Sequence, residues 1–318
     1  MSVMAMDVQE ASLVQEMVVN DPDLTGLEHC RVRLAETPHC ADSVGTVGGD
    51  WLGTVLGRDI VEAIRAFPAS PHKALLIRGI SLSTDIATPR NGFLPNAECV
   101  LDFDLLHFGM LRLLGVRPHA VEYENFGKLV RNVVPVPEAA GTTSSWGADV
   151  EFFWHTDNPN WPFADQSRSV ATAVPNFLAF TAVRNFEGAS TDIVCVDHVL
   201  SRLPTWAIAQ LQKAAYTFGA PASNEGFDGQ PRVLPVLEQD AGGYRLRFDD
   251  GIVAALDLDS EKALALLRQC LRDAQGIEVV LQPGDFFIFK NARVLHRRKA
   301  FQPLLNGKAR WLRRVYGS

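Results

Sequence analysis

The residues best suited to metal chemistry form a His-Thr-Asp motif at residues 155–157. The apolar run VEFFW just before it predicts a strand over residues 150–155. Side chains two apart in a strand share a face, so His155 and Asp157 point the same way. A third ligand must come from a distant segment, and His296, in the sequence NARVLHRR, is our candidate. Two histidines and one carboxylate leave three metal positions open, which is typical of non-haem Fe(II) oxygenases.

The motif by itself leaves other interpretations open. His155 could be a buried histidine of the core, with Asp157 capping a turn. The same three ligands also suit a zinc ion with a bound water, so a zinc-dependent hydrolase on a cupin-like barrel is an alternative. A non-catalytic barrel that binds a small molecule is another. An anchor for a cosubstrate would distinguish the iron oxygenase from both.

The final apolar segment, ARWLRRVY at residues 309–316, can supply such an anchor. With a period of two, Arg310 and Arg314 share one face of the predicted strand. Two arginines on a buried face need anionic partners, because an unpaired buried charge is very costly. The carboxylate of 2-oxoglutarate can bind one arginine through two hydrogen bonds, and a substrate carboxylate can bind the other. Arg313, on the opposite face, is expected to be solvated.

Most of the elements that position these residues are strands, with helices before and between them. We expect strands at residues 128–137, 150–155, 177–184, 191–196, 244–248, 277–281, 286–289 and 310–316, and helices at 50–67, 98–115, 203–217 and 260–274. The basic run Arg297-Arg298-Lys299 is interpreted as a solvated loop. This pattern favours a mainly β fold, a barrel or sandwich with helical cover.

Composition limits the class of protein. The 318 residues are 47% apolar and contain no long Gly/Ser-rich or Pro-rich linker, which favours one compact catalytic domain, residues 1–318. A net charge of −7 argues against a nucleic-acid partner. No apolar stretch approaches 18 residues, so we expect no membrane span. Five scattered cysteines without a CxxC pair favour a reduced, cytoplasmic protein. Residues 1–20 do not read as a signal peptide and are expected to be disordered.

Five segments together resemble a known family: GKLVRNVVPVP, VEFFWHTD, NFLAFTAVRN, PGDFFIFKNARVLHR and ARWLRRVY. From about residue 127 to residue 316, the chain resembles the clavaminate synthase-like branch of the Fe(II)/2-oxoglutarate oxygenases. This branch includes hydroxylases of free asparagine and arginine. The spacing from His296 to Arg310 is 310 − 296 = 14 residues. That spacing resembles this branch rather than the taurine dioxygenase branch, in which it is shorter.

The resemblance implies a fold and a division of the chain. The core would be a double-stranded β-helix, a distorted jelly roll, over residues 127–318, with an inserted helical lid around 201–275. Residues 21–126 would form a mixed helical and strand part of the same domain.

The resemblance also implies roles for single residues. Iron would be bound by His155, Asp157 and His296, the distal carboxylate of 2-oxoglutarate by Arg310 and Thr191, the substrate carboxylate by Arg314, and a polar substrate side chain by Asp249. The implied reaction, with O2, hydroxylates an unactivated carbon of a free amino acid or close derivative in specialised metabolism, and releases succinate and CO2. An amino acid tethered to a carrier protein is a variant of this substrate. An intact carboxylate ligand argues against halogenation.

Three positions depart from the family pattern. Asp157 stands where the branch commonly has glutamate, one methylene longer. Arg131-Asn132 stands where Gln-Asp is frequent, and Trp146 replaces a small polar residue. In relatives the last two positions line the substrate pocket, so Arg131 and Trp146 are expected to reshape it. Neither asparagine nor arginine is therefore carried over as the substrate.

Overall fold

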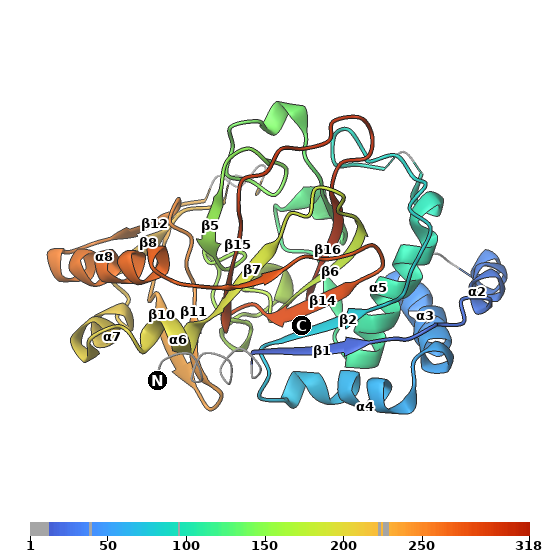
Figure 1. Cartoon of the computed structure of the whole chain (residues 1–318). Coiled ribbons are helices and arrows are strands. Elements are labelled where there is room, and N and C mark those ends of the chain that lie inside the picture. Colours follow the sequence, from blue (N-terminus) through green and yellow to red (C-terminus); the bar gives the residue numbers. More distant parts are fainter. Residues whose placement is uncertain (1–12, 38–39, 95, 222–223, 225–228) are drawn as a thin grey trace, which may run out of the picture.

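The computed structural model describes residues 13–37, 40–94, 96–221, 224 and 229–318. Strands occupy the middle of the molecule, and two groups of helices lie on opposite sides of them (Figure 1). The first group is α2 (Gly26–Ala35), α3 (Ala41–Val55), α4 (Arg58–Ala66) and α5 (Leu101–Leu114); the second is α6 (Val196–Leu200), α7 (Thr205–Leu211) and α8 (Leu258–Arg272). The fold is therefore mixed α/β.

Two sheets form the centre. A seven-stranded sheet has the order β1 (Val14–Val18), β2 (Ala74–Arg78), β14 (Phe286–Lys290), β6 (Phe177–Arg184), β16 (Trp311–Gly317) and β3 (Pro118–His119), and β4 (Arg131–Val133) also pairs with β16. A four-stranded sheet has the order β13 (Ile277–Val279), β7 (Thr191–Cys195), β15 (Val294–Arg298) and β5 (Phe152–His155). Smaller sheets contain β10 (Leu237–Asp240) with β11 (Gly243–Leu246), and β12 (Val253–Ala255), β8 (Tyr216–Phe218) and β9 (Arg232–Leu234).

Alternating side chains of the seven-stranded sheet serve two cores. On β14, Phe286 and Ile288 pack with the first group of helices. Phe287 and Phe289, one residue out of phase, join a cluster that also contains Ile193 of β7 from the four-stranded sheet. This period of two is the strand pattern expected where both faces of a sheet are covered. A third cluster packs α6, α7 and α8 against the outer face of the four-stranded sheet.

The environment of Arg313 contradicts the sequence prediction, because a helix covers this residue. It was expected to be solvated, but it is 3% exposed. Helix α5 covers this face of β16, and the guanidinium forms an ion pair with Asp104 of that helix. It also donates a hydrogen bond to Asn132 Oδ1 (3.4 Å). The paired carboxylate is what makes burial of this cation acceptable.

Helices α3 and α5 approach each other unusually closely, through glycine. A Cβ atom on Gly48 would lie 2.1 Å from the carbonyl oxygen of Leu105, which is impossible without displacement. The close approach fixes α5 over the sheet. There, His107 of α5 lies 2.8 Å from the Thr181 hydroxyl of β6, through its Nδ1 atom.

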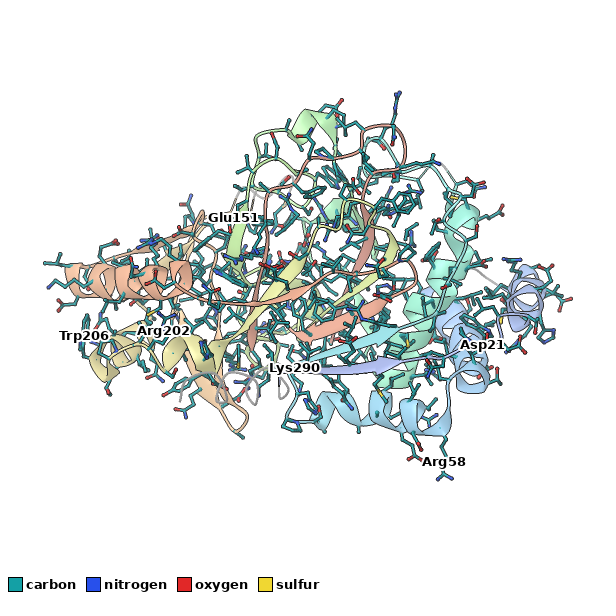
Figure 2. All side chains as sticks on the ribbon, viewed as in Figure 1. Asp21, Arg58, Glu151, Arg202, Trp206 and Lys290 are labelled. Atoms are coloured by element: carbon teal, nitrogen blue, oxygen red, sulfur yellow. The ribbon has the colours of Figure 1, made fainter. Side chains whose placement is uncertain are left out.

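The expectation of a solvated loop at residues 297–299 was wrong for Arg297 and Arg298, whereas Lys299 follows the strand and is exposed. Arg297 and Arg298 belong to β15, which lies between β5 and β7. Arg298 is buried and donates to backbone carbonyls, including that of Ala148 at 2.9 Å. Arg297 pairs with the buried Asp192 (3.0 Å) and, at 3.5 Å, with Glu151, labelled beside β5 in Figure 2. Acceptors from neighbouring segments thus allow basic residues inside a strand.

Other predicted elements agree with the structure to varying degrees. Strand 177–184 is confirmed as β6, and helix 98–115 as α5, which ends at Gly115 with a φ of 68°. The helix expected over 50–67 is two helices, because α3 ends at Val55 and the chain turns before Gly57, the N-cap residue of α4. The helix expected over 203–217 ends at Leu211, and Tyr216 already belongs to β8.

Two further expectations need correction. Residues 14–18 form β1, so disorder over 1–20 is wrong for this part, and residues 1–12 lie outside those described. The segment 201–275 was expected to be a helical lid, but it also contains strands β8 to β12. Within the described residues, no helix combines the length and the apolar character that crossing a bilayer requires.

Candidate metal centre

Two antiparallel strands bring the three predicted metal ligands together. In the register of β5 and β15, His296 stands opposite His155. Asp157 follows β5, and its Oδ1 atom lies 3.5 Å from Nε2 of His155 and 3.4 Å from Nε2 of His296. The ligand atoms of all three side chains lie within 4.8 Å of one another, and all three are buried. This donor set of two imidazoles and one carboxylate fits Fe(II) with three positions left open.

The two imidazoles are oriented differently. Nδ1 of His155 lies 2.7 Å from the carbonyl oxygen of Phe153, and the ring stacks on Phe152 with centroids 3.8 Å apart. These contacts turn Nε2 towards Asp157. His296 packs against Phe289, and its buried Nδ1 has no hydrogen-bond partner among the described residues. Burial, reinforced by His155, lowers the pKa of His296 to about 4, so the ring is neutral at pH 7 and can donate a lone pair.

Asp157 is held at both its backbone and its carboxylate. Its N–H donates to Asn291 Oδ1 (3.0 Å), and Asn291 Nδ2 donates back to its carbonyl (3.1 Å). The Oδ2 atom accepts hydrogen bonds from Arg314 (2.9 Å) and Tyr316 (2.8 Å). Burial raises the pKa of Asp157, but Arg314 and the two imidazoles outweigh it and hold that pKa well below its usual range. The carboxylate is therefore ionised, as a metal ligand requires.

Arg310 and Thr191 meet beside the metal ligands. Nη2 of Arg310 donates to the Thr191 hydroxyl (3.1 Å), and both residues are buried. They line a cavity of about 50 Å³ with the three ligands and Arg314. Burial, followed by the nearby Arg298, lowers the pKa of Arg310 to about 9, so it remains a cation at pH 7. Among the described residues it forms no ion pair, and its Nε is buried without a partner.

Arg314 has carboxylate partners of its own. It donates to Asp157 and forms an ion pair with Glu124, which is 3% exposed. Sequence reasoning missed Glu124. The available signal was the sequence Asn-Phe-Gly after it, a typical turn composition. Tyr123, Asn125 and Phe126 all have positive φ values between 52° and 64°, so Glu124 sits in a strained segment of the kind found at functional sites.

A larger cavity, of about 410 Å³, opens beside the metal ligands. Its volume is in the usual range for small-molecule sites, ~300–1,000 Å³. Asp249, Glu124 and Arg314 line it. Asp250 also lines the cavity but is neutralised by Arg268 at 2.5 Å. Asp249 accepts a hydrogen bond from Gly251 N–H (2.9 Å) and has no ion pair within the part of the chain that the structure describes.

Arg131 and Trp146 lie at the edge of this region. Arg131 donates from Nε to the Ser145 hydroxyl (2.7 Å), and its guanidinium stacks 4.5 Å from the Trp146 ring. With Glu124 and Arg314, Arg131 also lines a small hollow of about 10 Å³. Trp146 donates from Nε1 to the carbonyl of Asn132 (3.0 Å). The Trp146 ring also meets Phe93 edge-on, with centroids 5.7 Å apart, so it packs against Arg131 and the segment around Phe93.

Comparison with known protein families gives one match that covers most of the chain. Residues 105–316 match the family described as taurine catabolism dioxygenase TauD, TfdA family. Enduracididine beta-hydroxylase from Streptomyces hygroscopicus is 27% identical over 236 residues, 67% of this chain and 66% of that protein. L-asparagine oxygenase from Streptomyces coelicolor is 27% identical over 273 residues, 84% of this chain and 76% of that protein.

Solved structures agree with the fold. An asparagine oxygenase in complex with Fe(II), 2S,3S-3-hydroxyasparagine and succinate superposes with a TM-score of 0.74 at 23% identity, covering 95% of this chain and 92% of that one. The non-haem iron oxygenase OrfP, in complex with Fe, succinate and (3R,4R)-dihydroxy-L-Arg, gives a TM-score of 0.77 at 20% identity, covering 96% and 94%.

Proposed function

As a member of the TauD/TfdA family of dioxygenases, this chain is a non-haem Fe(II)/2-oxoglutarate oxygenase, and we propose that it hydroxylates an unactivated carbon of a free polar amino acid. The observation that carries the proposal is the buried His155–Asp157–His296 group, beside which the buried guanidinium of Arg310 forms no ion pair among the described residues. Metal binding alone would not provide an anionic partner for this buried guanidinium. A cosubstrate with a carboxylate gives it a partner.

The metal ligands and the cosubstrate anchor have separate tasks. His155, Asp157 and His296 hold the iron, which supplies the oxidising chemistry when 2-oxoglutarate and O2 are bound. Arg310 binds the distal carboxylate of 2-oxoglutarate through a charge-assisted hydrogen-bond pair, and Thr191 adds a hydroxyl. The burial of both residues excludes water and strengthens this electrostatic interaction.

The polar groups of the larger cavity suit the two charged ends of an amino acid. Arg314 is the donor for the substrate carboxylate. Glu124, paired with Arg314, is the acceptor for the ammonium group. Asp249 is then left for the substrate side chain, which favours a donor such as an amide, ammonium or guanidinium. The substrates in the names of the curated relatives, asparagine and enduracididine, carry nitrogen-rich side chains.

The proposal extends to fold and setting. The facing four- and seven-stranded sheets support a double-stranded β-helix (jelly roll), with the ligands on β5, just after it and on β15. We propose that residues 1–318 act as one catalytic domain, and that the substrate belongs to specialised metabolism. The five cysteines are free thiols, which supports a cytoplasmic location.

The test is succinate release from 2-oxoglutarate with Fe(II) and O2 across a panel of free amino acids. We expect one polar amino acid to stimulate succinate formation and to yield a product heavier by one oxygen atom. The His296→Ala variant should lose both signals while still folding. An enzyme that is active with Zn(II) and inert towards 2-oxoglutarate would overturn the proposal. Slow decarboxylation that no free amino acid stimulates would redirect the substrate search to carrier-tethered amino acids.

A further inference from the structure

The two oxygens of Asp157 are used in different ways. Oδ1 faces the Nε2 atoms of His155 and His296, at 3.5 and 3.4 Å. Oδ2 points to the last strand, where it accepts hydrogen bonds from the hydroxyl of Tyr316 (2.8 Å) and from Arg314 (2.9 Å). A carboxylate with one oxygen engaged in this way offers only the other oxygen to a metal.

The hydroxyl of Tyr316 is itself placed by a buried neighbour. Asn158 donates from Nδ2 to the Tyr316 oxygen (2.9 Å) and to Glu124 (2.9 Å). Asn158 adopts a positive φ of 53° directly after Asp157. Since Asn158 supplies the hydrogen bond that the hydroxyl accepts, the proton of Tyr316 remains for a carboxylate. Asp157 Oδ2, at 2.8 Å, is nearer than Glu124 at 3.2 Å.

The length of the ligand gives this contact its consequence. An aspartate brings its carboxylate closer to the backbone than a glutamate would. Its second oxygen could also reach the metal unless something holds it back. Two-oxygen binding would occupy one of the three positions needed by the cosubstrate and O2. Arg314 alone is a poor restraint, because it also serves Glu124 and, on the proposed function, the substrate carboxylate.

We propose that the hydroxyl of Tyr316 is a positioning group that keeps Asp157 bound to the metal through a single oxygen. The inference rests on the proposed function, since it presumes that Asp157 is an iron ligand. Tyr316 also lines the cavity of about 410 Å³, but this role does not require it to touch substrate or cosubstrate. It acts through Asp157, and its aromatic ring separately packs in the core between the two sheets.

The test compares Tyr316→Phe, which removes only the hydroxyl, with Tyr216→Phe, which removes a buried hydroxyl from the cluster beneath α8. Anaerobic titration with Fe(II), without substrate, measures the metal Kd of each variant. We expect Tyr316→Phe to change the Kd about 10–100-fold, the usual size of the effect when a hydrogen bond to a metal ligand is lost. Tyr216→Phe should match the wild type. Circular dichroism and Tm check that both variants fold.

A second measurement separates positioning from simple loosening of the core. Tyr316→Phe is repeated in an Asp157→Glu background, where the longer ligand places its second oxygen elsewhere. Positioning predicts that the two effects on the Fe(II) Kd are not additive, because the residues act as a pair. Additive effects, or an unchanged Kd in a folded Tyr316→Phe variant, would overturn the inference. A wild-type protein that binds no Fe(II) would instead overturn the proposed function.

Discussion

Arg310 is a buried cation whose side chain has a hydroxyl, from Thr191, as its hydrogen-bond partner. Such a residue is unfavourable in an empty site, because the protein supplies little to replace the water it has lost. The free energy is recovered when an anion of matching shape binds. The site is thus preorganised for a carboxylate before any ligand arrives, which is the general advantage of rigid recognition.

Two substitutions that remove parts of this preorganised site should each weaken 2-oxoglutarate binding, to different extents. Arg310→Gln removes the charge-assisted hydrogen bonds, each worth about 1.5–3 kcal/mol, and should raise the KM for 2-oxoglutarate by two orders of magnitude or more. Thr191→Val removes one hydrogen bond to a charged group, worth about 1.5–3 kcal/mol, and should raise the KM for 2-oxoglutarate about 10–100-fold. Steady-state succinate formation measures both. A normal KM in Arg310→Gln would exclude Arg310 as the anchor.

The adjacent acids Asp249 and Asp250 offer a matched test of the substrate side-chain site. Asp249→Asn should raise the substrate KM at least tenfold while leaving the KM for 2-oxoglutarate unchanged, because this carboxylate has no cation partner among the described residues. Asp250→Asn should alter neither value, since Asp250 already pairs with Arg268. Equal effects of the two substitutions on turnover would contradict a specific role for Asp249.

At the residue scale, the sequence allowed prediction of those site residues whose type and spacing are typical of a metal site or an anion-binding site. The His-Thr-Asp motif and the arginines of the last strand were foreseen, and they come together. Glu124, Asn158 and Asn291 were not foreseen, because their positions depend on loops whose backbone adopts positive φ or on contacts across more than 100 residues. Alternation along a strand carries no information about such contacts.

At the scale of elements, the contact between α3 and α5 is a tight constraint. Gly48 allows the helices to touch, and α5 then presents Asp104 to Arg313 and His107 to Thr181. Both partners lie on central strands of the seven-stranded sheet. The outer helices therefore hold the back of the same strand, β16, whose front carries Arg314.

Two glycines of α3 should respond in opposite ways to alanine. Gly48→Ala should destabilise the protein by about 1–3 kcal/mol, because the new methyl group collides with the Leu105 carbonyl. Gly53→Ala, on an open face of the same helix with nothing within 4 Å, should stabilise it by about 0.5–1 kcal/mol. Chemical denaturation measures both. A neutral Gly48→Ala variant would mean that the helices separate easily.

The elements were predictable where hydrophobic periodicity was strong. β6 and α5 follow their patterns closely. β15 was missed because it ends in two arginines followed by a lysine, a sequence typical of solvated segments, whereas its arginines are satisfied by Asp192 and by carbonyls of another loop. Tertiary partners decided its structure, and a single sequence does not reveal them.

At the scale of the whole molecule, several ionisable groups are buried away from the metal centre. His107 is an example: burial lowers its pKa to about 3, aided by Arg313. In the unfolded chain its pKa would be about 6.5. Between these two values only the unfolded state binds the proton, so acid favours unfolding. Above pH 6.5 the residue has no such effect.

Replacing His107 with glutamine should therefore reduce the loss in free energy of unfolding that the protein undergoes at acidic pH. The free energy of unfolding of the wild type relative to His107→Gln should fall as the pH is lowered from 6.5 to 4. The slope should approach ~1.4 kcal/mol per pH unit. Denaturation at several pH values measures it, and taking the difference removes most contributions from other titrating groups. If the free energies of unfolding of the wild type and the variant changed in parallel with pH, His107 would take up its proton equally in the folded and unfolded states.

The overall arrangement was predictable only in part. Alternating patterns indicated strands with helical cover, and the structure has both. The strand order was not accessible, because β14 lies between β2 and β6 although the three come from distant parts of the chain. Such pairings depend on which apolar faces meet in space, not on local periodicity.

The last strand, β16, and the residue before it fix the spacing between the two arginines of the site. Arg310 directly precedes β16 and Arg314 lies within it, so the cosubstrate arginine and the substrate arginine are four residues apart on one segment, with a register shift between Trp311 and Leu312. Inserting or deleting one residue between them would move the side chains on one side of the change to the other face of the strand. New specificities, whether arising in lineages or in the laboratory, are therefore to be sought in the opposite wall, the loops around residues 143–145 and 249–252. The strand fixes where the carboxylates of cosubstrate and substrate bind, and those loops determine which substrate side chain fits.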